Sequence, residues 1–171
     1  MPIWRTPEQI VSPKVHAFDA YWRARRPPDG GLPRRSDIEP AELRALLPHI
    51  LIADFQADPL EVRYRLIGTK IVEMSRVDFT GKRLADCDFQ AEDPGVWRRA
   101  YDLIAESAEP VYGRIDIPPA EGTSDRRVTE EFGIFPLSLD GRTVAQCIAL
   151  EDYDAADPRV APEDLRPMRV R

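Results

Sequence analysis

The segment VTEEFGIFPLSLDGRTVAQCIAL, which runs from Val128 to Leu150, decides the fold class of this chain. Both of its halves are rich in β-branched and aromatic residues, which favour strands, and they flank the dipeptide Asp140-Gly141. This dipeptide is typical of two-residue hairpin turns of type I′, in which both central residues have positive φ. We therefore predict a strand over 128–139, a tight turn, and an antiparallel partner strand over 143–150.

Three further strands are predicted upstream of this hairpin. The apolar, β-branched run over 49–55 predicts a buried strand, and the alternation of apolar and charged residues over 62–67 predicts a half-buried partner. A similar alternation over 111–117 predicts a strand directly before the hairpin. Five strands joined largely by hairpins cannot form a parallel doubly wound sheet, because parallel neighbours need crossover connections.

Two amphipathic helices are predicted around these strands. The first follows the Ser12-Pro13 cap and carries an apolar stripe of Val15, Phe18 and Trp22, which must be buried either against its own sheet or in a dimer. The second runs from about Asp93 to Ala108. Shorter helical segments are expected after Pro40, after Gly68 and over 84–88, while residues 1–11 are expected to be an irregular lead-in.

The predicted fold class is therefore α+β, with a five-stranded antiparallel sheet, helices on one face and an extra N-terminal amphipathic helix. We expect three parts: an N-terminal helix and linker over 1–31, a domain over 32–152, and a flexible C-terminal tail over 153–171 that is poor in large apolar residues. A length of 171 residues suits one such domain with tails.

Composition and charge exclude several classes of protein. No stretch of the sequence approaches the roughly 18–20 apolar residues of a membrane span, and the start lacks the features of a secretion signal. A net charge of −6 argues against a nucleic-acid binder, although a basic cluster is present and is interpreted as a solvated helix end and linker. Its members are Arg23, Arg25, Arg26, Arg34 and Arg35. With only two cysteines, taken to be reduced, we expect a cytoplasmic protein.

The order of elements and four local motifs resemble the PAS fold. Phe135-Pro136-Leu137, Asp140-Gly141 and Asp152 resemble the final PAS hairpin, and the segment from Phe79 to Leu84 resembles the glycine-plus-basic segment between the short helices. The segments 32–38 and 64–69 are similar to a bacterial family of stand-alone PAS-like proteins. This resemblance spans about residues 32–152. It implies regulation by ligand sensing or by protein contact, with no shared catalytic residue to carry over.

Cofactors that PAS proteins are known to hold need recognisable residues, and the sequence disfavours both haem and flavin. The only histidines, His16 and His49, lie outside the long helix where an axial haem ligand is expected. Cys87 stands in a segment like the flavin-reactive motif, but aspartates replace the expected asparagine and arginine, and Leu150 replaces the expected glutamine. Neither the histidines nor the cysteines have a usual metal-ligand spacing.

A ligand pocket between sheet and helices remains open, with plain core as the alternative for its apolar members. An arginine on the inner side of a strand would need an anionic partner, either a ligand or a nearby acid such as Glu130 or Asp116. The pocket candidates are Tyr64, Arg65, Met74, Trp97, Tyr101, Arg114, Phe132 and Ile134.

Three functions follow as hypotheses. The first is a regulatory module without catalytic activity, which acts on a separate signalling protein and forms a homodimer through Val15, Phe18 and Trp22. The second is a sensor with a tightly bound small molecule. The third is a thiol-dependent enzyme, for which Cys87, Cys147 and a histidine such as His49 are the conventional reactive groups.

Overall fold

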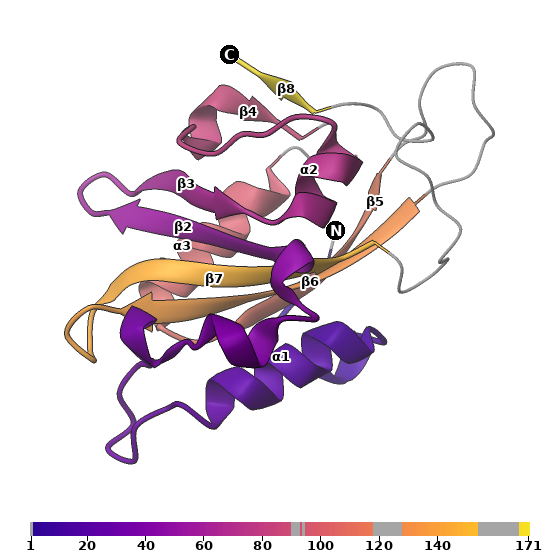
Figure 1. Cartoon of the computed structure of the whole chain (residues 1–171). Coiled ribbons are helices and arrows are strands. Elements are labelled where there is room, and N and C mark those ends of the chain that lie inside the picture. Colours follow the sequence, from indigo (N-terminus) through magenta and orange to yellow (C-terminus); the bar gives the residue numbers. More distant parts are fainter. Residues whose placement is uncertain (1, 90–92, 94, 118–127, 154–167) are drawn as a thin grey trace.

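The computed structural model of the chain describes residues 2–89, 93, 95–117, 128–153 and 168–171. Its main sheet has six strands in the order β1-β5-β6-β7-β2-β3 (Figure 1). Every neighbouring pair in this sheet is antiparallel, as the sequence predicted. The strands are β1 (Ile3–Trp4), β2 (Ile50–Gln56), β3 (Glu61–Ile67), β5 (Val111–Ile117), β6 (Val128–Ser138) and β7 (Val144–Asp152).

Three α-helices and several short turns complete the fold. The helices are α1 (Pro13–Arg23), α2 (Thr69–Ser75) and α3 (Val96–Ser107). Single 3₁₀ turns occur at η1 (Pro7–Gln9), η2 (Arg35–Asp37), η3 (Pro40–Leu43), η4 (Leu47–His49) and η5 (Leu84–Asp86). The segments after Pro40 and Leu84 therefore form 3₁₀ turns, and Cys87–Asp88 forms the short strand β4.

The sheet carries one apolar core on each face. On one face α2 and α3 pack over a cluster that includes Leu51, Tyr64 and Phe132. On the other face α1 packs against β6 and β7, and Figure 1 shows this helix in indigo on the side of the sheet away from α3. The predicted α+β class, with the N-terminal helix added to a helix-covered sheet, is confirmed.

The apolar stripe of α1 is buried against its own sheet, which is the first of the two alternatives left open by the sequence. Val15, Phe18 and Trp22 all have 0% of their surface exposed in the single chain. The ring centres of Phe18 and Phe135 lie 5.0 Å apart, and the indole Nε1 of Trp22 donates to the carbonyl of Pro136 at 2.9 Å. A dimer contact through these three residues would require α1 to leave the sheet.

The first residues of the chain form structure where an irregular lead-in was predicted. Ile3 pairs with Gly113 and Trp4 pairs with Tyr112, so β1 adds a sixth strand at the free edge of β5. A two-residue strand is too short to show the period of two by which strands are recognised in a sequence. The expectation for residues 1–11 was therefore wrong in this part.

The final hairpin is confirmed, but its turn is not of type I′. Gly141 has a φ of 88°, whereas the non-glycine residues with positive φ in the described chain are Asp58, Arg76 and Ala108. Asp140 instead accepts hydrogen bonds from the backbone N–H groups of Arg142 and Thr143, each at 2.8 Å. This side-chain capping stabilises a wider loop between Ser138 and Val144.

The C-terminal residues that the structure describes pack on the domain. Tyr153 is 5% exposed and Met168 is 7% exposed. The last strand, β8 (Arg169–Val170), pairs with β4, and the N–H of Met168 donates to the carbonyl of Ser75 at 3.0 Å. Of the tail predicted as flexible over 153–171, residues 154–167 lie outside the described residues.

The packing of α1 predicts the effect of truncating its central aromatic residue. Replacing Phe18 with alanine should destabilise the protein by about 3–5 kcal/mol, because it leaves a cavity between α1 and Phe135. Urea denaturation of the full chain measures this change. Val11→Ala is the control, because this side chain is 64% exposed and its loss should change stability by less than about 0.5 kcal/mol. Equal stability of both variants would contradict the described packing of α1.

Candidate functional site

Four acidic side chains are buried where β6 and β7 run side by side. Their residues are Glu130, Glu131, Glu151 and Asp152, and none is more than 5% exposed. Glu131 pairs with Asp152 across the two strands, and Phe132 pairs with Glu151. Because side chains alternate between the faces of a strand, Glu131 and Asp152 lie on the α1 face, whereas Glu130 and Glu151 lie on the α3 face.

On the α1 face both carboxylates are balanced by partners. Glu131 accepts from the backbone N–H groups of Val11 and Ser12 at 2.8 and 2.7 Å, and it forms an ion pair with Arg114. Asp152 accepts from the hydroxyl of Ser12 at 2.5 Å and pairs with Lys14 at 2.7 Å. These contacts fix the first turn of α1 to the sheet, and the basic residues supply the opposite charge.

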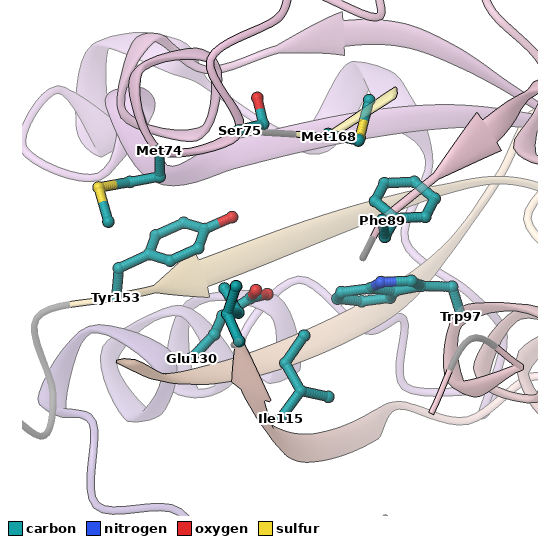
Figure 2. A pocket seen from close by; sticks show the side chains of 9 residues that line it. Met74, Ser75, Phe89, Trp97, Ile115, Glu130, Tyr153 and Met168 are labelled. Carbon is teal, nitrogen blue, oxygen red and sulfur yellow. The ribbon is translucent and has the colours of Figure 1, made fainter. Parts of the chain in front are cut away.

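On the opposite face Glu130 lines a small cavity of about 40 Å³, and Glu151 is the acidic neighbour that acts on Glu130. Figure 2 shows the carboxylate of Glu130 between the rings of Tyr153 and Trp97. Among the described residues, Oε1 of Glu130 and the indole Nε1 of Trp97 are buried with no hydrogen-bond partner. Glu151 accepts from the hydroxyl of Tyr153 at 2.7 Å. The cavity is lined by Met74, Ser75, Phe89, Trp97, Ile115, Ile117, Glu130, Tyr153 and Met168.

Burial changes the ionisation of this acid pair. Removal from water raises the pKa of Glu130 well above its usual value, and the nearby charge of Glu151 raises it further. Burial likewise raises the pKa of Glu151, to about 7, although the hydrogen bond from Tyr153 lowers it. A buried acid pair with raised pKa values beside a cavity is the kind of arrangement found at functional sites, and these residues form our candidate site.

The structure brings together only part of the predicted pocket. Trp97 and Met74 line the cavity, as expected. Four other candidates belong to the apolar core on the same face, which is the alternative that the sequence left open for them. These are Tyr64, Tyr101, Phe132 and Ile134.

The two predicted arginines lie away from the cavity. The side chain of Arg65 is 63% exposed and pairs with Asp54 at 3.1 Å, because it lies on the outward-facing side of the edge strand β3. Arg114 lies on the α1 face, and its partner is Glu131 instead of the expected Glu130 or Asp116. The expectation that either arginine points into the pocket was therefore wrong.

Sequence reasoning missed the residues that make the cavity polar. Glu130 and Glu151 were not expected as site residues, and Tyr153 and Met168 were assigned to the tail. A signal was available, because an acidic residue on the inward-facing side of a long apolar strand is expensive to bury. Only the pairing of β6 with β7 shows that two such residues share one face.

The thiols and histidines do not form a reactive pair. Cys147 lies opposite Ala53, whereas His49 Nδ1 lies 3.0 Å from the carbonyl oxygen of Glu151. Burial raises the pKa of the Cys147 thiol and raises that of Cys87 to about 11. Both thiols are therefore poor nucleophiles at neutral pH, since the thiolate is the reactive form.

Within the described ranges, no three residues among the histidines, cysteines, aspartates and glutamates are arranged to hold a metal ion. No described helix is long and apolar enough to cross a membrane.

A flavin does not fit the cavity as the described residues form it. Pockets for ligands of that size are roughly 300 Å³ or more, whereas this cavity measures about 40 Å³. The rings of Tyr64, Phe79 and Phe89 pack edge to face in the same core. These rings fill the part of the interior next to the cavity.

The chain is an α+β domain whose antiparallel sheet carries a helix-covered apolar core on each face. The sequence model of the PAS domain family matches residues 10–148, and the chain belongs to this family. The match includes α1, which the sequence analysis had placed outside the domain. PAS domains are generally sensory modules, so membership supports a regulatory sensing role. None of the curated proteins matches the chain.

Solved structures of light-oxygen-voltage proteins are similar to this chain. One is a light-oxygen-voltage domain examined with a flavin analogue, at 12% identity and a TM-score of 0.47, over 66% of this chain and 81% of that one. An RNA-binding light-oxygen-voltage receptor has 19% identity and a TM-score of 0.47, over 72% and 36% of the two chains. A fungal LOV domain photoreceptor has 13% identity and a TM-score of 0.44, over 86% and 98%.

The raised pKa values predict how stability depends on pH. Between the pKa of an unfolded glutamate, roughly 4.3, and that of folded Glu151, about 7, the folded state binds more protons than the unfolded state. The contribution of these carboxyls to stability should therefore be greatest below this window and fall as pH rises through it, by up to about 1.4 kcal/mol per pH unit for each carboxyl. Urea denaturation at several pH values measures this slope.

Matched variants isolate the contribution of the buried pair. Glu151→Gln should lose its part of the slope, because glutamine does not titrate. Glu73→Gln is the control, since Glu73 is 52% exposed on α2 and its variant should keep the wild-type slope. A Glu151→Gln variant with the slope of the wild type would show that this carboxyl does not titrate in the window.

Proposed function

We propose that this PAS domain is a regulatory sensor without catalytic activity, which detects a small molecule in the cavity and passes the signal to a separate protein. One observation carries the proposal. Glu130, which lines the cavity, and its acidic neighbour Glu151 are the immediate chain neighbours of Glu131 and Asp152, which hold α1 on the other face. The input site and the anchor of α1 are therefore connected through single peptide units.

This arrangement gives a physical route for the signal. A change in charge or in occupancy at the cavity alters the forces on the side chains of Glu130 and Glu151. Because the interior is closely packed, small shifts of β6 and β7 are transmitted to the carboxylates on the other face. Those carboxylates accept hydrogen bonds from Val11 and Ser12 at the start of α1. We infer that α1 is the element whose stability reports the state of the cavity.

Hydrogen exchange tests the connection between cavity and helix. In the full chain, Glu130→Gln and Glu151→Gln should each change the exchange protection of amides in α1 severalfold, although neither residue touches this helix. Glu131→Gln is the positive control, since it removes a direct anchor of α1. Glu73→Gln is the negative control. If α1 exchanges as in the wild type in both cavity variants but faster in Glu131→Gln, the proposed connection is contradicted.

The enzyme hypothesis has less support from the site. The raised pKa values of Cys87 and Cys147 and the pairing of Cys147 with Ala53 argue against a conventional thiol mechanism. The sensor with a tightly bound ligand remains a second candidate, because the cavity has unpartnered polar groups. Its size restricts such a ligand to a few non-hydrogen atoms.

We also propose that the protein forms a homodimer in the cytoplasm. Both cysteines are free, which agrees with a reducing compartment. The buried stripe of α1 does not supply the interface in this structure, so we place it on the exposed side of the same helix. This side carries Ala17 and Ala20, small exposed residues that allow close approach of a second helix.

Sedimentation equilibrium of the full chain tests this interface. The wild type should have the mass of two chains, and Ala20→Glu should shift the population towards one chain by placing like charges across the interface. Lys70→Glu on α2 is a control that changes charge elsewhere. A single-chain mass for the wild type at all concentrations would exclude the homodimer.

A further inference from the structure

Among the described residues, no basic side chain pairs with the acids on the cavity face, whereas both acids on the α1 face have a basic partner. On the α1 face, Glu131 pairs with Arg114 and Asp152 pairs with Lys14. Within the part of the chain that the structure describes, neither Glu130 nor Glu151 has a lysine, arginine or histidine side chain as a partner. The strands β6 and β7 thus bury one acid pair that has basic side chains as partners and one that has none among the described residues.

Two unpartnered polar groups of opposite character face this cavity. Oε1 of Glu130 can only accept a hydrogen bond when the carboxyl is ionised, and Nε1 of Trp97 can only donate one. Glu130 is 2% exposed and Trp97 is 4% exposed, so bulk water does not satisfy either group. A complementary ligand therefore has a donor at one end and an acceptor at the other.

The walls of the cavity suit a cation with a short apolar portion. The rings of Phe89 and Trp97 lie 5.8 Å apart, and Tyr153 forms the opposite side in Figure 2. Aromatic faces attract cations, and the thioethers of Met74 and Met168 provide polarisable, adaptable contacts. A water molecule needs at least roughly 10–15 Å³ of such space, so about 40 Å³ holds only a few non-hydrogen atoms.

We propose that the cavity binds a small protonated amine that also carries one hydrogen-bond acceptor, with the ammonium group donating to Glu130 and the acceptor facing Nε1 of Trp97. Short amino alcohols are the simplest members of this chemical class. This inference rests on the proposed function, since it names the input of the same sensor. The ammonium group takes the place that Arg114 and Lys14 occupy on the other face.

Binding of such a cation should release protons. In the empty protein the buried pair retains protons towards neutral pH, and an ammonium group favours the ionised form. The titratable groups that act on one another here are Glu130 from β6, Glu151 from β7, Tyr153 directly after β7, Tyr64 from β3, Tyr101 from α3, and the thiols of Cys87 and Cys147. The pKa of each tyrosine is raised by burial, so the glutamates are the groups that ionise.

Calorimetric titration of the full chain with three probes of similar size tests the proposal. 2-Aminoethanol has both the charge and the acceptor, ethylammonium has only the charge, and ethylene glycol is neutral. We expect affinity to fall in that order, and heats in two buffers of different ionisation enthalpy should show net proton release for the two amines. Absence of binding by 2-aminoethanol at millimolar concentration, or equal binding of ethylene glycol, would overturn the inference.

Two variants assign the contacts. Glu130→Gln should weaken the binding of 2-aminoethanol by about tenfold to hundredfold, since it removes a charge-assisted hydrogen bond. Trp97→Phe should weaken that of 2-aminoethanol by about threefold to tenfold and leave ethylammonium unchanged, because only the N–H is lost. Glu73→Gln should bind all three probes as the wild type does. Should the glutamine variant not fold, the probe series on the wild type and the Trp97→Phe comparison still decide the matter.

The outcomes separate this inference from the function on which it rests. If the amines fail to bind but α1 still responds to Glu130→Gln and Glu151→Gln in hydrogen exchange, the amine is the wrong ligand class and the sensor stands. If the amines bind but α1 does not respond, the cavity is a binding site and the proposed route of the signal is wrong.

Discussion

The structure depends on the alternation of side chains along β6 and β7 at the point where both strands carry consecutive acidic residues. Strand pleating sends Glu131 and Asp152 to one face and Glu130 and Glu151 to the other. On the first face the acids bind the N-terminal turn of α1, and on the second Glu130 lines the cavity beside Glu151. The same four residues therefore hold the N-terminal helix and make the interior polar.

The acid pairs on the two faces of the sheet differ in their partners. Burying an ionised carboxylate is costly unless it is paired, and the α1 face meets this cost with Arg114, Lys14 and backbone donors. The cavity face has Tyr153 as a donor and no described basic partner, so the pKa values of Glu130 and Glu151 rise. This difference in pairing, within one short stretch of sheet, is the physical basis of the response to protons or to a cation that we propose for the site.

The packing of the surrounding side chains explains why the cavity is small. Aromatic rings from β3, α3 and the segment around Phe79 pack edge to face and fill the space between sheet and helices. Met168 from the C-terminal segment and Met74 from α2 border what remains. A PAS fold of this kind leaves space for a few atoms beside the acid pair, so charge and hydrogen bonding contribute more to recognition than buried apolar area.

The sequence by itself determined the strands 111–117 and 128–150, the antiparallel class and the two amphipathic helices, because these features depend on local periodicity and turn residues. It also restricted the apolar stripe of α1 to burial, and it placed Trp97 and Met74 near the interior. Tertiary structure alone decided that α1 covers the second face, that Ile3 and Trp4 extend the sheet, and that Arg114 pairs with Glu131. It also decided that Glu130, Trp97, Tyr153 and Met168 meet at one cavity. These contacts join residues far apart in the chain, and strand register and helix docking set them through the packing of the whole domain, which no local pattern records.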